Sequence, residues 1–458
     1  MAYLDDVRRA CAQQLDWQIP QTELYQAYFE GTSSILALLD TEERQVFRRF
    51  LDESYANWGE LVVNAVAERL QVVGFSWGDS SDAAWALWKA NSMNADAELV
   101  QTDAICTGRG YVLVQPDDSS PVGVTITAES PLEATVLYQP GNRRVRLAGY
   151  KRYLNPVDGH TTEVVITPEQ IATWGPGVGD AVVEVNPAGT VGLIEVTAQP
   201  RTMGPPRSEL DPAIPVIDRI HTTIFNRLVA SDFGAFRQIW ATGVRLARQV
   251  VTTTAADGTT SQSEVLVKPW NVGANQLLTN EDPAGKFGVF AGDPLTGYLA
   301  AVEQDIETMA GITQTPPYYL HGKLVNLSAD AIKALEAGLV SKVHRRMLHI
   351  GESWEIVMRT ALGLIGDPGA ANVEGEVVWK DPETRSLAQL SDALTKLATI
   401  GVPQQELWRR LGASPQEIEQ WEQWNAQNAA KGITMAATTM PTQPAPPPAD
   451  DTAEPVPA

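Results

Sequence analysis

The apolar positions between residues 328 and 363 recur every three or four residues, which is the period of an α-helix. No proline interrupts these 36 residues. The spacing therefore predicts one continuous amphipathic helix, which at 1.5 Å per residue is a rod of roughly 54 Å. We expect Ser328 to cap its start. The expected buried face is Ile332, Leu335, Leu339, Val343, Met347, Ile350, Trp354, Val357, Ala361 and Leu364.

A second amphipathic segment precedes this long helix. Its apolar positions predict a helix over residues 293–311. Pro316 and Pro317 follow, and because proline disfavours helix in the residue before it, the chain is expected to reverse there. Helix, proline-containing loop and long helix form one unit in this interpretation.

The rest of the chain alternates between helical and strand-like stretches. Helices are predicted over 57–70, where Asn57 is the expected cap, and over 211–232. Period-two patterns between turn residues predict strands through 111–198 and a hairpin around Asp257-Gly258. Two or three short helices are predicted over 381–431. The proline-rich residues that follow contain too little apolar surface to fold and predict a flexible, extended tail.

Four cationic or titratable side chains lie in the middle of the long helix, namely Lys342, His344, Arg345 and Arg346. They are too far from either end to interact with the helix dipole, so we expect them to have another partner. For Arg345 and Arg346, a carboxylate of an acidic neighbour or of an adjacent subunit is favoured over DNA.

Four blocks of residues, in order, resemble a known family. They are Asn57-Trp58-x-x-Leu61-Val62-Val63, then Trp88-x-x-Asn91-x-Met93 through Thr107-Gly108-Arg109-Gly110-Tyr111, then Arg207-Ser208-Glu209-Leu210 through Leu228-Val229-Ala230-Ser231-Asp232, and finally Gly311-Ile312-Thr313 with Pro316-Pro317-x-x-Leu320-x-Gly322 and the long helix to Gly351-Glu352-Ser353-Trp354-Glu355. They span residues 57–364, about two-thirds of the chain. Their combination resembles the portal proteins of tailed bacteriophages, in particular the family of the Bacillus phage SPP1 portal.

The resemblance implies an α+β ring subunit with a helical wing, a β-rich insertion, a two-helix stem with a small β clip, a long wing helix and a helical crown. The implied regions are 1–206 for the N-terminal wing, 207–235 for the first stem helix, 236–293 for the clip, 294–312 for the second stem helix, 313–327 for a tunnel loop, 328–380 for the long helix and the rest of the wing, 381–431 for the crown-like helices and 432–458 for a disordered tail. The roles of the 111–200 strands and of the tail stay open.

The resemblance also implies a function. A phage portal protein forms a dodecameric ring at the unique capsid vertex, where it is the conduit for terminase-driven packaging and ejection of double-stranded DNA and the attachment site of the head–tail connector. The implied partners are other copies of the chain, the terminase motor, the major capsid and scaffolding proteins, the connector and the passing DNA, with no membrane. The resemblance further implies that the protein assembles in the host cytoplasm and ends in the virion. It implies neither a cofactor nor a metal.

Two sets of candidate site residues come from these patterns. In portals the loop before the long helix projects into the channel, so His321, Lys323, Asn326 and Ser328 are expected near DNA. Lys323 is the only cation of that loop at neutral pH. Without the resemblance, a loop between two helices is usually just exposed to solvent. The candidates for an oligomer interface are Arg345, Arg346 and Trp354.

The charge balance limits the partners of this chain. A formal net charge of −22 and a pI near 4.6 exclude a general DNA clamp, because such a protein neutralises phosphates with clustered Lys and Arg. The same acidity suits the wall of a conduit along which DNA must slide, and it equally suits an ordinary soluble protein. Two cysteines without a CxxC pair fit a reducing cytoplasm, and the absence of a long apolar run predicts a soluble, unexported protein.

Chemical motifs are weak in this sequence. The glycine run from Gly175 to Gly179 contains a proline where a phosphate turn would start, and Gly285-Lys286 lacks the Ser or Thr and the upstream glycine of a phosphate loop. His344 and His349 are five residues apart and do not share a helix face as metal ligands do. We therefore expect a non-enzyme. The alternatives are a non-enzymatic helical and β binding module and an unrecognised hydrolase.

Overall fold

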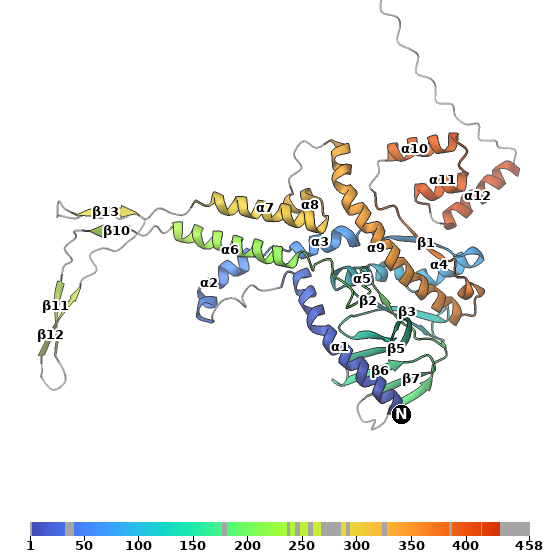
Figure 1. Cartoon of the computed structure of the whole chain (residues 1–458), viewed down its shortest axis with the longest axis horizontal. Coiled ribbons are helices and arrows are strands. Elements are labelled where there is room, and N and C mark those ends of the chain that lie inside the picture. Colours follow the sequence, from blue (N-terminus) through green and yellow to red (C-terminus); the bar gives the residue numbers. More distant parts are fainter. Residues whose placement is uncertain are drawn as a thin grey trace, which may run out of the picture.

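The computed structural model describes residues 2–32, 41–175, 181–235, 239–242, 248–254, 260–266, 285–289, 294–322, 328–383, 387–413 and 415–430. Over these residues the chain mixes helices with antiparallel sheets, as the expected α+β class requires. Figure 1 shows a broad body from which one pair of helices projects sideways.

The helices of the described residues are α1 (Ala2–Phe29), α2 (Thr41–Ser54), α3 (Trp58–Ala67), α4 (Ser81–Ala90), α5 (Met93–Cys106), α6 (Ile214–Ala235), α7 (Thr296–Thr313), α8 (Pro317–His321), α9 (Ala329–Leu364), α10 (Leu387–Thr399), α11 (Gln404–Leu411) and α12 (Pro415–Ala430), with short 3-10 turns at Gly78–Ser80 and Pro368–Ala371. The strands are β1 (Val72–Ser76), β2 (Gly110–Pro116), β3 (Val124–Glu129), β4 (Ala134–Gln139), β5 (Asn142–Leu154), β6 (Thr161–Ile166), β7 (Gln170–Trp174), β8 (Val182–Val185), β9 (Leu193–Val196), β10 (Ile239–Thr242), β11 (Arg248–Thr254), β12 (Thr260–Leu266), β13 (Lys286–Val289) and β14 (Glu376–Trp379).

The predicted long helix is confirmed as α9, which contains 36 residues. The Ser328 hydroxyl caps it by accepting a hydrogen bond from the backbone N–H of Ala331 at 3.2 Å. The predicted apolar face is buried from Leu339 to Ala361. Leu335 is an exception and is 42% exposed, because the first turns of α9 extend beyond the body in Figure 1.

Helices α6 and α7 lie side by side and form the projection (Figure 1). Arg219 of α6 pairs with Asp305 of α7 at 2.7 Å. At the far end, β10 pairs with β13 and β11 pairs with β12. The two predicted helices, 211–232 and 293–311, are therefore confirmed as α6 and α7, each starting about three residues later than expected. The predicted hairpin is confirmed by the antiparallel pairing of β11 with β12. Its Asp257-Gly258 turn lies outside the described residues.

The predicted strand region forms two antiparallel sheets, with strand orders β3-β2-β9 and β4-β5-β6-β7-β8. Apolar side chains of both sheets pack together, among them Tyr111, Val136 and Leu193. Gly149 permits this close approach, because a Cβ there would lie 2.7 Å from the Cβ of Leu193. Helix α1 covers the five-stranded sheet through Val7, Cys11 and Leu15, whose partners are Ala148, Tyr150 and Val165.

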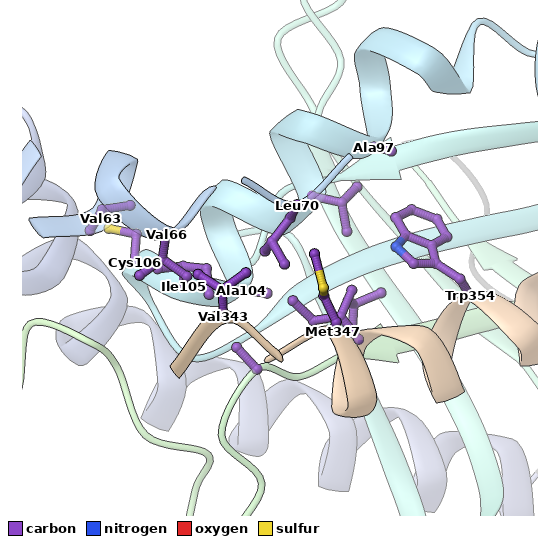
Figure 2. Packing of buried hydrophobic residues seen from close by; sticks show 14 of the residues in the cluster. Val63, Val66, Leu70, Ala97, Ala104, Ile105, Cys106, Val343, Met347 and Trp354 are labelled. Carbon is purple, nitrogen blue, oxygen red and sulfur yellow. The ribbon is translucent and has the colours of Figure 1, made fainter. Parts of the chain in front are cut away.

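The main core forms where α9 crosses α3 and α5. Figure 2 shows Val343, Met347 and Trp354 of α9 facing apolar side chains of these helices. The Trp354 ring meets the edge of Trp88 from α4, with ring centroids 5.0 Å apart. Because Trp354 is fully buried within its own chain, its assignment to an oligomer interface is wrong. Strand β14, which no sequence pattern indicated, follows α9 and pairs with β1.

The C-terminal described residues form three helices, α10, α11 and α12, in the region predicted to hold two or three. The tail from residue 432 onward lies outside the described residues. Within the described ranges, no helix is both long enough and apolar enough to cross a bilayer. Cys11 and Cys106 are free thiols, each buried in a different cluster.

We predict that Trp354→Ala lowers the free energy of unfolding by about 3–5 kcal/mol, because truncating a buried tryptophan removes apolar contacts and leaves a cavity. Leu348→Ala is the matched control on the same helix, since Leu348 is 64% exposed, and is expected to change stability by less than about 0.5 kcal/mol. Chemical denaturation of both variants as unassembled single chains measures the difference. Equal losses would contradict the central role of Trp354.

Candidate functional site

The chain reverses between α7 and α9 in the segment predicted to be a tunnel loop. The expectation of an irregular loop is partly wrong, because Pro317–His321 form the short helix α8. Proline suits the first helical position, where its fixed φ fits and no N–H is needed. Gly322 ends α8 with a φ of 63°, in the left-handed region. His321 and Ser328 therefore flank the segment as the last residue of α8 and the cap of α9, whereas Lys323 and Asn326 lie outside the described residues.

A polar cluster fixes α8 to α9 and α3. The rings of Tyr318 and Tyr319 meet edge to face, with centroids 4.8 Å apart, and both hydroxyls donate to Glu336 of α9. Arg69, just beyond α3, donates to the Tyr319 hydroxyl at 2.8 Å and pairs with Glu336 at 3.3 Å. Burial alone would lower the pKa of Arg69, but Tyr319 and Glu336 raise it above its usual value. The tyrosines pack within the chain and hold the start of the reversal in place.

A second, more deeply buried cluster joins α9 to the ends of α6 and α7. Glu209 lies a few residues before α6, and its carboxylate accepts from Arg346 Nε at 2.5 Å and pairs with Lys342 Nζ at 3.4 Å. Lys342 Nζ also donates to the carbonyl oxygen of Thr313, the last residue of α7, at 2.6 Å. Lys342 and Arg346 are four residues apart and share one helix face. This face of α9 therefore holds the body-side ends of both projecting helices.

The segment that carries Glu209 is itself fixed to α5. The Glu209 N–H donates to the Ile105 carbonyl at 3.0 Å, and the Ser208 hydroxyl donates to the Cys106 carbonyl. These contacts satisfy carbonyl groups at the C-terminus of α5 that lack helical partners. The Arg207-Ser208-Glu209-Leu210 block therefore has a structural role as the junction between α5, α6 and α9.

The electrostatics of this junction depend on burial and on charge pairing together. Burial by itself would raise the pKa of Glu209, but Lys342 and Arg346 outweigh it and bring that pKa below its usual value. Burial lowers the pKa of Lys342 despite the attraction of Glu209, and the nearby Arg346 lowers it further. One carboxylate thus compensates two cations that solvent hardly reaches.

The two remaining interface candidates, Arg345 and Arg346, differ in exposure and in partner. Arg346 has the acidic partner that its position predicts, but the partner belongs to the same chain, and its side chain is only 10% exposed. Its assignment to an oligomer interface is therefore wrong. Arg345 is exposed and donates to Gln314 at 3.4 Å, so it remains a candidate. Sequence reasoning missed Glu209 as the partner, because a pairing across 137 residues has no local signal.

We predict that Glu209→Gln lowers the free energy of unfolding by about 3–5 kcal/mol at pH 7, because it leaves two buried cations without their counter-charge. Since the folded pKa of Glu209 is depressed, its stabilisation is present above the unfolded pKa and lost as pH falls through the folded pKa. The difference from the unsubstituted chain should therefore shrink in acid. Denaturant titrations at neutral and acid pH measure it.

Glu374→Gln, at an exposed position, is the matched control and should leave stability unchanged. A Glu209→Gln variant as stable as this control at pH 7 would show that the buried charges do not hold the junction.

The family model and the sequence relatives that match this chain share one description. Residues 9–431 match the family model described as phage portal protein, SPP1 Gp6-like. The portal protein of Mycobacterium phage D29 is 27% identical over 424 residues, covering 85% of this chain and 83% of that protein. The portal protein of Mycobacterium phage L5 is 27% identical over 423 residues, covering 85% and 82%.

Solved structures of gene transfer agent particles are more distant. A chain in the neck of an empty particle matches with a TM-score of 0.44 and 13% identity, covering 81% of this chain and 94% of that one. A chain in a native virion matches with a TM-score of 0.43 and 14% identity, covering 78% and 90%. These likenesses are too weak to add to the argument. The match across residues 9–431 is decisive, and by it this chain belongs to the SPP1 Gp6-like family of phage portal proteins and has a portal function.

Proposed function

We propose that copies of this chain assemble into a dodecameric ring at one capsid vertex and form the conduit for double-stranded DNA during packaging and ejection. The observation that carries the proposal is the projecting pair α6 and α7, clamped at its base by Lys342 and Arg346 of α9. A clamped pair of helices can pack side by side with copies of itself around an axis. Family membership supplies the rest of the support.

The regions of a portal subunit map onto this architecture in the proposal. Residues 1–206 and 328–380 make the wing, 207–235 and 294–312 the two stem helices, and 236–293 the clip. The crown corresponds to 381–431, where α10, α11 and α12 lie. The clip would then be the far end of the projection, and the crown would lie at the other end of the molecule (Figure 1).

The partners follow from this position. A terminase motor and later a head–tail connector would engage the ring from outside the capsid, and major capsid and scaffolding proteins would surround it. The ring would assemble in the host cytoplasm and remain in the virion. The chain would act as a structural protein without catalysis or cofactor, since the motor supplies the chemical energy.

The loop between α8 and α9 is the proposed point of DNA proximity. His321 and Ser328 flank it, and Lys323 and Asn326 are the side chains in it that suit weak phosphate contacts. One cation per subunit favours transient contact, because several strong ionic contacts would hold the DNA in place. The tyrosine cluster fixes α8, and with it the residue that precedes the loop, to α9 and Arg69.

We predict that the purified chain forms closed rings with a central hole. Negative-stain imaging and native mass measurement at high protein concentration test this directly, and the mass gives the number of subunits. Particles of single-chain mass alone, under several salt conditions, would overturn the proposal and favour a monomeric binding module.

We predict that Lys323 lies next to DNA in filled particles. A benzoylphenylalanine photo-crosslinker in place of Lys323 should give covalent DNA adducts on irradiation of DNA-filled particles. Empty particles with the same substitution are the matched control and should give none. Equal, background-level signals from both would place this loop away from the DNA path while leaving ring formation intact.

A further inference from the structure

Arginines gather around one open groove of this acidic chain. The groove has a volume of about 640 Å³ and lies between α1, the start of β5 and α9, with Arg109, Arg143, Arg144 and Arg201 in its lining. A second groove, of about 570 Å³, follows α9 and shares Leu348 with the first. Together the two linings contain six Lys or Arg and four Glu. The whole chain has 34 Lys or Arg and 56 Asp or Glu, so the excess of acidic residues is reversed in these grooves.

Glu195 and Glu336 of these grooves are paired with cations of the same chain, whereas the arginines at the rim of the first groove have no carboxylate partner among the described residues. Glu195 accepts from the Tyr138 hydroxyl at 3.0 Å and lies 3.6 Å from Arg109. Arg143 donates only to the carbonyl oxygen of Arg201, at 3.1 Å. Within the residues that the structure describes, no carboxylate pairs with Arg143, Arg144 or Arg201. Neighbouring like charges of this kind are stabilised by an external anion.

One large apolar side chain lines both grooves, and a second lies one helical turn from a lining residue. Leu348 is 64% exposed at the point where the two grooves meet. Trp17 is 65% exposed and lies one turn along α1 from Gln14, which lines the first groove. Exposed aromatic and aliphatic anchors next to arginine are typical of protein–protein interfaces. Phosphate contacts, by comparison, use basic and polar groups without apolar anchors.

We propose that the face formed by Gln14, Trp17, Arg143, Arg144, Arg201 and Leu348 is one side of the contact between neighbouring copies and receives an acidic surface of the next copy. The inference rests on the proposed ring. Closed rings of identical chains use a head-to-tail contact that joins two different surfaces. Because the acidic excess of this chain lies outside the face, the next copy supplies the complementary charge.

Thiol accessibility tests this contact without disrupting it. Cys11 and Cys106 are both buried, so a thiol introduced at the surface reports alone. L348C is compared with V157C, whose position in the turn between β5 and β6 is 92% exposed. In assembled rings, a maleimide should react with L348C at least ten times more slowly than with V157C. In single chains the two rates should be similar.

Charge reversal tests the electrostatic part. R143E/R144E is compared with R409E/R410E, an adjacent arginine pair on α11 that contacts Glu406 of its own chain. Mass photometry should show that R143E/R144E needs at least ten times more protein to form rings, with R409E/R410E unchanged. Thermal melts of both variants confirm that they fold.

The possible outcomes are distinct. Rings in which L348C reacts as fast as V157C would overturn this inference and leave the proposed function standing. Unchanged assembly of R143E/R144E together with weaker binding of duplex DNA would overturn it as well and identify the face as a nucleic-acid contact. A chain without substitutions that never assembles would overturn both proposals.

Discussion

One buried carboxylate holds the projecting helices to the body. Glu209 lies between Lys342 and Arg346, and Lys342 also holds the last carbonyl of α7. Ions so poorly solvated are stable only when they are paired, because the cost of removing each from water is several kcal/mol. The arrangement therefore has one satisfactory geometry. A shift of α6 or α7 relative to α9 would separate charges that water cannot reach, so the base of the projection is rigid.

Because these charges lie on α9, the rigid base of the projection is connected to the main core. Lys342 and Arg346 are interleaved with Leu339, Val343, Met347 and Ile350, which are buried in the main core, and Trp354 extends the same face to α4. One helix thus contacts the main core, the segment that leads into α6 and the last residue of α7 through adjacent turns. The hydrogen bonds of Tyr318 and Tyr319 to Glu336 also attach α8, where the chain reverses, to the same helix. Forces on the projection, the reversal or the core would reach all three through α9.

The sequence predicted what depends on local periodicity. The extent of α9, its Ser328 cap, the strand-rich region and the pairing of β11 with β12 follow from spacing and turn residues. Long-range contacts have no such signal, so Glu209 was not recognised as the partner of Arg346, nor β14 as the partner of β1. Trp354 was assigned to an interface because periodicity shows that a helix face is covered but not which chain covers it. Arg346 was assigned there because a cation in the middle of a helix needs a partner, and its position does not show which chain supplies one. The candidate loop was located by its prolines, but its proximity to DNA came from the resemblance alone, and its role stays a proposal.

The strong acidity of the chain has to be reconciled with assembly of many identical copies. At physiological ionic strength the Debye length is about 8 Å, so repulsion between distant acidic surfaces is largely screened. What matters for docking is the charge within that distance of the contact, where the arginines beside Leu348 reverse the local balance. Net charge and local charge can then serve different purposes. In the proposed ring, the basic, partly apolar face would favour contact between copies, and the acidic remainder would leave the channel wall with few sites that hold a passing phosphate backbone.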